Sequence, residues 1–167
     1  EKIEHKEFAV TRELIRKACE IGIATVDIPE EYGGAEMDKI SSALVAEHIS
    51  VSGSFSVAFG GHVGIGTLPI VYFGTPEQKA RMLPPLIAGQ DKACFAVTEP
   101  DAGLETLKLK TFARRDGDRY VVNGKKIWIS TAQVAHKMLL LARTTPREQL
   151  AKPTQGLSLF YVDFDRS

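Results

Sequence analysis

Cysteine is scarce in this sequence. Its two cysteines, Cys19 and Cys94, lie far apart and form neither a CxxC pair nor a Cys/His cluster. This spacing argues against a disulfide framework and against the usual cysteine-based metal sites, and it favours a reducing compartment. We therefore predict no bound metal.

An excess of charge of either sign is also missing. Lysine and arginine together number 21, and aspartate and glutamate also number 21. A balanced chain has no net charge that would attract nucleic acid or an anionic membrane. Any anionic ligand must therefore be held by local contacts, and we expect no nucleic-acid partner.

Long apolar runs are the third absence. No stretch of about 18 apolar residues is evident, and the charged residues 1–5 lack the apolar core of a signal peptide. We expect a soluble chain without a membrane-spanning segment. Because the sequence has no initiator methionine and stops directly after a strand-like run, we also expect it to be part of a longer protein. Its 167 residues, 44% of them hydrophobic, suffice for one domain or for a small domain joined to part of another.

The first half of the sequence predicts helices. Apolar residues recur at helical spacing in residues 8–21, and Asp38 can cap a second helix. Residues 54–73 carry almost no charge and are expected to be buried on most sides. Thr75 and Gln78 form a capping box that starts a fourth helix, which the prolines at 84 and 85 should disturb. The residues expected on the inward face of the second helix are Ile40, Ala43, Leu44 and Ile49.

The second half predicts strands, because β-branched and aromatic runs alternate with turn residues after Asp91. Asn123-Gly124 and Asp116-Gly117 both favour tight hairpin turns, and the first would join residues 120–122 directly to residues 126–129. The segment 144–155 is expected to be an exposed loop. The predicted strands are residues 93–98, 111–115, 119–122, 126–130, 137–143 and 157–163.

Two local features could hold a ligand. The stretch 95–103 contains a strand that ends at Thr98, followed by an acid, a proline and a glycine-containing turn. Backbone N–H groups and a hydroxyl there could bind the polar edge of a flat heterocycle, although an ordinary strand-to-turn explains the same residues. Trp128, the only tryptophan, could lie against such a ring or could fill the core.

Taken together, these motifs resemble the acyl-CoA dehydrogenase family. Thr98-Glu99-Pro100, followed some thirty positions later by Trp128-Ile129-Ser130, is the most specific pair. Further matching motifs lie at residues 62–70, 73–79, 83–86 and 120–126. The resemblance implies an α+β fold: an all-helical domain at residues 1–90, then part of an antiparallel β-barrel or sandwich domain at residues 91–167. A C-terminal helical bundle would lie outside this chain.

The resemblance also implies a flavin cofactor, FAD, and the residues that contact it. The Thr98 hydroxyl and nearby backbone would bind the polar edge of the isoalloxazine, Trp128 would abut the ring, and Ser130 would reach toward N5. The full set of expected flavin contacts is Phe95, Val97, Thr98, Gly103, Trp128, Ile129 and Ser130. Leu104 departs from the family pattern, which has serine at this position, and this leaves the substrate contacts undefined.

The implied reaction is α,β-dehydrogenation of an acyl-CoA thioester, as in fatty acid β-oxidation, with hydride transfer to flavin N5. The family's glutamate base lies in a C-terminal domain that this chain does not reach, so we assign no catalytic residue and expect the chain alone to be inactive. Glu99 is expected to stabilise its turn, and His62 to be a structural histidine.

The resemblance further implies an electron-transfer flavoprotein as partner, a homo-oligomer, and a bacterial cytoplasm or mitochondrial matrix as the location. Two other functions stay open from the sequence. One is a related flavoenzyme such as an acyl-CoA oxidase, and the other is a non-catalytic module that binds flavin or a partner subunit.

Overall fold

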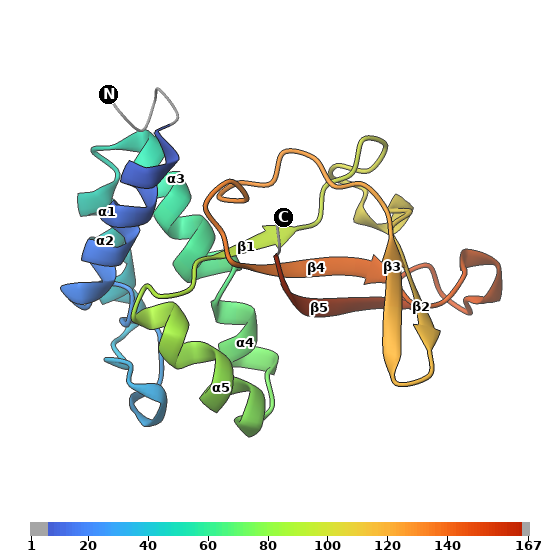
Figure 1. The fold of residues 1–167 in the computed structure, drawn as a ribbon, viewed down its shortest axis with the longest axis horizontal. Coiled ribbons are helices and arrows are strands. Elements are labelled where there is room, and N and C mark those ends of the chain that lie inside the picture. The colour runs from blue at the N-terminus through green and yellow to red at the C-terminus, as the bar shows by residue number, and fades with distance from the viewer. Residues whose placement is uncertain (1–6, 165–167) are drawn as a thin grey trace.

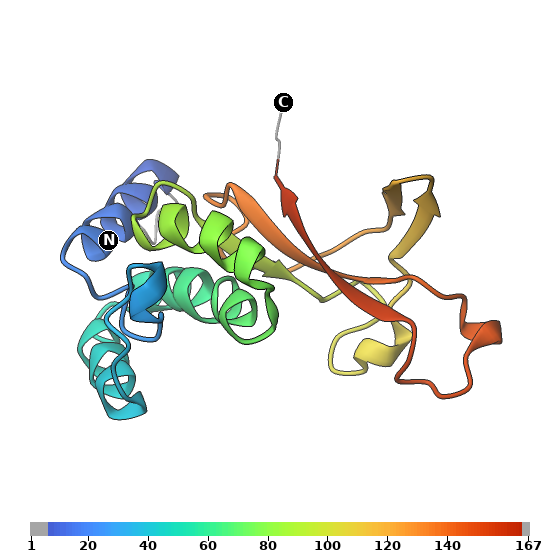
Figure 2. The same cartoon turned by 90° about the horizontal axis from the view of Figure 1, so that it is seen from below.

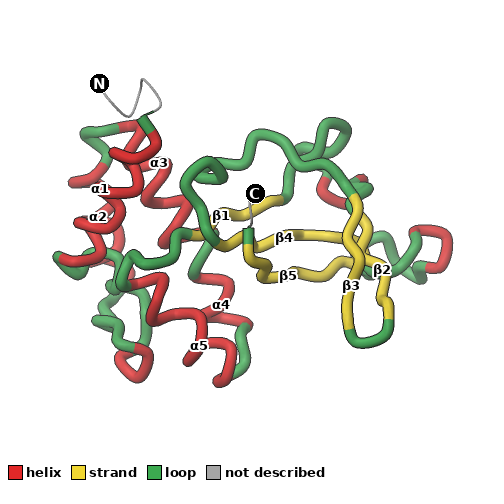
Figure 3. Tube along the Cα trace, viewed as in Figure 1, coloured by secondary structure: helices red, strands yellow, loops and turns green. Residues whose placement is uncertain are grey.

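The structure of the protein, a computed structural model, describes residues 7–164. Within them, every α-helix precedes the first strand, and the helices gather at one end while the strands extend to the other (Figures 1 and 2). The α-helices are α1 (Phe8–Glu20), α2 (Lys39–Ile49), α3 (Gly53–Gly60), α4 (Leu68–Phe73) and α5 (Pro76–Ile87). The strands are β1 (Ala93–Ala96), β2 (Phe112–Asp116), β3 (Arg119–Asn123), β4 (Lys137–Arg143) and β5 (Leu157–Asp163). Short helical turns are η1 (Glu30–Tyr32), η2 (Gly61–Ile65), η3 (Thr106–Lys108) and η4 (Arg147–Gln149). The predicted α+β fold, helices first and sheet second, is confirmed (Figure 3).

The first and last α-helices form as the sequence predicts. Helix α1 buries Ile15 and Cys19 in a core that also contains Phe59 of α3. Helix α5 begins with the predicted capping box, in which Thr75 and Gln78 each bind the other's backbone N–H. The helix continues through Pro84 and Pro85 to Ile87. The expected disturbance by these prolines therefore does not end the helix.

The predicted inward face of α2 is largely wrong. Ile40 and Leu44 are 70% and 50% exposed. Ile49 does pack against the core as predicted, but its partner there is Val45, which the predicted inward face does not include. The helix is apolar in several directions, with isoleucine, leucine, valine and alanine on different faces, so its periodicity does not define which face is buried.

The long uncharged segment is neither a single element nor buried on most sides. The run Gly53–Phe73 divides into α3, a π-helical turn at Gly61–Ile65, and α4, and within its most apolar 18-residue stretch only 39% is buried. By length and composition alone this run could cross a membrane, contrary to the expected lack of such a stretch, although core helices satisfy the same criterion. Gly66 at its centre is required for close approach, because an added Cβ would lie 2.8 Å from the Cβ of Ala93.

The sheet has five strands and is mixed, whereas the expected β domain is antiparallel. Strand β4 pairs with β1 in parallel and with β5 antiparallel, and it meets β2 at the single pair Phe112↔Arg143. Strands β2 and β3 form a hairpin whose turn contains Gly117 at φ 62°. The Asp116-Gly117 turn is therefore confirmed. The hairpin at Asn123-Gly124 and the strand at residues 126–130 are wrong, because residues 124–130 belong to no strand and β3 pairs with β2.

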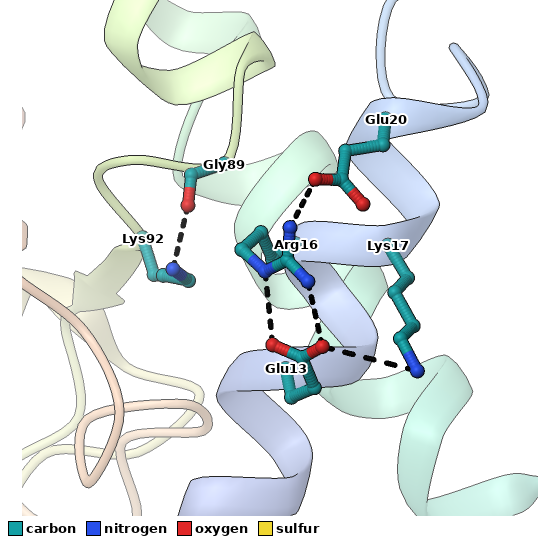
Figure 4. Close-up of polar contacts among 6 residues, drawn as sticks. All are labelled: Glu13, Arg16, Lys17, Glu20, Gly89 and Lys92. Atoms are coloured by element: carbon teal, nitrogen blue, oxygen red, sulfur yellow. Dashed lines mark hydrogen bonds and ion pairs between the residues drawn. The ribbon is translucent and has the colours of Figure 1, made fainter.

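A polar junction ties the helices to the sheet. Lys92 is buried, its ammonium donates to the carbonyl of Gly89 at 2.6 Å, and burial lowers its pKa. Gly89 presses on α1, since an added Cβ would lie 3.1 Å from the Cα of Arg16. Figure 4 shows the hydrogen bond from Lys92 to Gly89 beside the exposed ion pairs that Arg16 makes with Glu13 and Glu20 along α1. The start of β1 is thus fixed against the first helix.

Candidate functional site

The candidate site forms where two segments distant in sequence meet at the end of β1. The turn after Thr98 is closed by two backbone hydrogen bonds between Glu99 and Ala102, of 3.0 and 3.2 Å. The segment that leaves β3 runs back beside this turn, and the N–H of Ile127 donates to the carbonyl of Thr98 at 3.0 Å. The structure therefore brings together the two stretches that the sequence analysis selected as flavin segments.

Gly124 explains why the chain takes this path. A Cβ added to Gly124 would lie 2.2 Å from the Oγ1 of Thr111, so the backbone here passes directly against the residue before β2. The glycine serves a close backbone approach and not a hairpin turn. This tertiary contact overrides the local turn preference of Asn-Gly.

Trp128 stands out from the surface. Its side chain is 87% exposed, so the interpretation of this residue as core filling is wrong. Its backbone is left-handed, with φ 57°, and Thr131 is left-handed too, with φ 70°. A non-glycine residue in this region costs about 1–2 kcal/mol, and such strained residues cluster at ligand sites. The indole is presented to solvent by a backbone that the surrounding structure must hold in place.

The other predicted flavin residues lie around this junction with different exposures. Val97, Thr98 and Ile129 are half-buried, whereas Gly103 and Ser130 are exposed. Leu104, which departs from the family serine, is exposed as well. Phe95 is half-buried in β1 and in register with Leu139 of β4. Parallel partners share a face, so Phe95 and Leu139 point to the side opposite Met138 and Leu140.

A hollow of about 510 Å³ lies beside the indole of Trp128. Among its lining residues are Thr111, Ile127, Trp128, Ile129, Met138 and Leu140, and they do not include Phe95, Val97 or Thr98. The structure therefore brings Thr98 and Trp128 to one junction but leaves Phe95 on the other face of the sheet from this hollow. Its mixed apolar and polar lining is typical of sites for small organic ligands.

Glu99 accepts three hydrogen bonds. Its carboxylate accepts from the backbone N–H groups of Lys110 at 2.5 Å and Thr111 at 2.9 Å, and from the ammonium of Lys126 at 2.9 Å. Burial by itself would raise the pKa of Glu99, but these donors lower it to about 2. A buried carboxylate that stays ionised because three donors stabilise its charge is a poor general base. This geometry supports the expected role in the turn.

His62 is a structural residue. It is 1% exposed, with Nε2 3.1 Å from the carbonyl of Leu86, and its Nδ1 accepts from the N–H of Ala93 at 3.1 Å. Burial lowers the pKa of His62 to about 4, so the ring is neutral at pH 7. In residues 7–164 no group of three or more His, Cys, Asp or Glu side chains could hold a metal ion.

Two residues that shape the site escaped sequence analysis. Lys126 is placed by the hairpin prediction in a strand, and no spacing rule pairs it with Glu99. Thr131 anchors the segment after Trp128, because its buried hydroxyl donates to the carbonyl of Ala58 at 3.3 Å. Both contacts depend on how distant segments meet, and neither leaves a local signal.

Sequence models of protein families match almost the whole chain. The model described as "Acyl-CoA dehydrogenase, N-terminal domain" matches residues 1–90, and "Acyl-CoA dehydrogenase, middle domain" matches residues 94–167. The chain belongs to the acyl-CoA dehydrogenase family, which confirms the resemblance of its motifs.

Individual relatives agree. A probable acyl-CoA dehydrogenase of Bacillus subtilis is 46% identical over 143 residues, which are 84% of this chain and 24% of the relative. The crystal structure of an acyl-CoA dehydrogenase complexed with FAD from Bacillus anthracis matches with a TM-score of 0.86 and 41% identity, covering 96% of this chain and 27% of that one. The prolyl acyl carrier protein oxidase AnaB matches with a TM-score of 0.77 and 30% identity, covering 92% and 40%. The chain thus spans less than half of the length of these relatives.

Proposed function

We propose that this chain is the flavin-holding part of an FAD-dependent acyl-CoA dehydrogenase, an oxidoreductase that forms an α,β double bond in an acyl-CoA thioester. The observation that carries the proposal is the junction of Thr98 with Ile127, which presents the exposed indole of Trp128 beside a hollow. An apolar ring left in solvent is unfavourable, and a flat ring laid over it removes that surface from water. Membership of the family and the FAD complex of a similar protein give further support.

The residues of the chain would bind and orient the isoalloxazine. FAD, when bound, would supply the hydride acceptor. The Thr98 hydroxyl and the exposed backbone of the turn offer donors to the polar edge of the ring, the Trp128 indole offers a face, and Ser130 offers an exposed hydroxyl. Val97, Gly103 and Ile129 complete the proposed flavin contacts. Phe95 faces the other side of the sheet from the hollow and is left out of the proposed set.

The proposal extends to the organisation and setting of the whole protein. We propose a helical domain at residues 1–90 and a β domain at residues 91–167, because α5 ends at Ile87 and β1 begins at Ala93. An acyl-CoA as substrate, an electron-transfer flavoprotein as acceptor, assembly as a homo-oligomer, and a bacterial cytoplasm or mitochondrial matrix as location also belong to the proposal.

Replacement of Trp128 tests the cofactor site. In the full-length protein that carries this sequence, Trp128→Ala is expected to weaken FAD binding by about tenfold to a hundredfold, because ring stacking on an aromatic side chain contributes about 1–3 kcal/mol. Thermal unfolding of the flavin-free protein should stay nearly unchanged, since the side chain is exposed. FAD affinity is measured by titration of flavin fluorescence.

Two control variants make this test specific. Phe73→Ala removes another aromatic ring that is 82% exposed, and it should leave FAD binding unchanged. His62→Ala should lower stability but weaken FAD binding less than Trp128→Ala does. Equal affinity in the wild type and Trp128→Ala would contradict the proposed site.

An oxidase is the second candidate, since the chain is also similar to a prolyl acyl carrier protein oxidase. The two activities differ in the electron acceptor. Hydrogen peroxide formed in step with thioester consumption would favour the oxidase, whereas reduction of an artificial acceptor without peroxide would favour the dehydrogenase.

A further inference from the structure

The buried ion pair of Lys126 and Glu99 lies directly under the candidate flavin site. The Lys126 ammonium donates to the carbonyl of Val97 at 2.8 Å and to the Glu99 carboxylate at 2.9 Å. The two side chains are only 9% and 5% exposed. The Lys126 side chain is therefore held in one conformation, because moving its ammonium away from these two acceptors would leave a buried charge without a partner.

This pair joins three stretches of the chain. Lys126 precedes the Ile127–Trp128 stretch, and Val97 and Glu99 flank Thr98 in the other flavin segment. The Glu99 carboxylate also accepts from the backbone of Lys110 and Thr111, which lead into β2. A single ammonium and a single carboxylate therefore fix the two flavin segments to each other and to the sheet.

The strained backbone at Trp128 needs such support. A left-handed tryptophan persists only where the structure on both sides determines it. Lys126 is the anchor before Trp128, and Thr131 is the anchor after it, through its hydroxyl bond to α3. The side chain of Trp128 is largely exposed, so its own packing contributes little to holding this backbone.

We propose that Lys126 is a positioning residue for flavin: its buried bonds to Val97 and Glu99 set the Trp128 indole and the Thr98 edge at the spacing that one isoalloxazine ring requires. This inference rests on the proposed function and goes beyond it, because Lys126 need not touch the cofactor. Its effect should therefore appear in how the flavin is held and in the environment of the ring.

The test compares three variants of the full-length protein that carries this sequence. Lys126→Met keeps the length of the side chain and removes the charge. Lys126→Arg keeps the charge and the donors, and Lys125→Met makes the same change at the exposed neighbouring lysine. The measurements are the dissociation constant of FAD and the visible circular dichroism of bound flavin, which reports how the ring is oriented by its surroundings.

Lys126→Met is expected to weaken FAD binding by about tenfold or more, since it deletes two charge-assisted hydrogen bonds that orient the site, and to change the visible dichroism of retained flavin. Lys126→Arg should restore the dichroism, and Lys125→Met should match the wild type in both measurements. If Lys126→Met does not fold, Glu99→Gln takes its place, because it removes the same charge pair while keeping the shape of the side chain.

The outcomes separate this inference from the proposed function. Folded Lys126→Met with the affinity and dichroism of the wild type would overturn the positioning role and leave the proposed function intact. Weaker binding in Lys126→Met with an unaltered flavin spectrum, and no recovery in Lys126→Arg, would also overturn it, because a general loss of stability gives that result. A wild-type protein that takes up no FAD would overturn both.

Discussion

The proton affinity of one buried ring, His62, affects the stability of the whole fold. Its two nitrogens contact backbone groups of α5 and β1, so the neutral ring joins the helices to the sheet. Burial lowers its pKa from 6.5 to about 4. Below pH 6.5 the unfolded chain binds a proton at this position that the folded chain does not bind, and stability must therefore fall as the pH falls.

We predict that this single group removes about 2–3 kcal/mol of stability between pH about 7 and pH about 4.5. The measurement is urea unfolding at both pH values for the wild type and His62→Gln. His62→Gln is expected to be less stable than the wild type at pH 7. Its free energy of unfolding should fall less on acidification, because it has no imidazole to protonate. His48→Gln, at an exposed histidine, should behave as the wild type does. An equal loss in the wild type and His62→Gln would show that the ring is not buried in its neutral form.

Single residues differ in how far their sequence predicts their role. The capping partners Thr75 and Gln78 are three positions apart, so a local pattern identifies them. Glu99 is correctly expected to support its turn, but its partner Lys126 is invisible to any local rule. The exposure of Trp128 is likewise undetermined by sequence, because isoleucine neighbours on both sides fit a buried strand equally well.

Elements are predictable where their signal is local and fail where distant contacts decide. Of two Gly-containing turn signals, Asp116-Gly117 forms its hairpin and Asn123-Gly124 does not. Gly124 instead allows its backbone to pass close to the side chain of Thr111, and the N–H of Ile127 in the following segment donates to the carbonyl of Thr98. Strand β4 pairs in parallel with β1, which needs a long connection that no turn signal marks. The two flavin segments could be named from the sequence, but their contact could not be derived from it.

The N-caps of two helices offer a matched test of the capping signal. Thr75 accepts a hydrogen bond from the N–H of Gln78, whereas Ser52, the N-cap of α3, makes no side-chain cap bond. Thr75→Ala is therefore expected to lower the free energy of unfolding by about 1 kcal/mol, and Ser52→Ala by less than about 0.5 kcal/mol. Chemical denaturation of both variants checks this. Equal losses would mean that the capping box does not stabilise α5.

The whole molecule combines a helical half and a sheet half that share contacts across their boundary. Val134, from the segment that follows Trp128, lies in the same core as Ile15 and Phe59. Ala93 of β1 lies in the second core with Ile70, Leu83 and Leu86. Because the flavin segments are fixed to both halves, the site depends on the helices as well as on the sheet. Within residues 7–164, however, the two side chains considered for proton transfer, Glu99 and His62, both make structural hydrogen bonds.

We expect this chain alone to lack the catalytic base that turnover requires. Abstraction of an α proton requires a base near its working pH that reaches the substrate. Glu99 is occupied by three donors with its pKa held at about 2, and His62 is buried between α5 and β1. We therefore predict that acyl-CoA thioesters do not bleach flavin bound to this 167-residue chain under anaerobic conditions, whereas they bleach flavin in the full-length protein. Dithionite should reduce the flavin in both samples, which controls for a ring that cannot accept electrons. Thioester-dependent bleaching by the chain at the full-length rate would place the base within these residues and would require a different assignment of their roles.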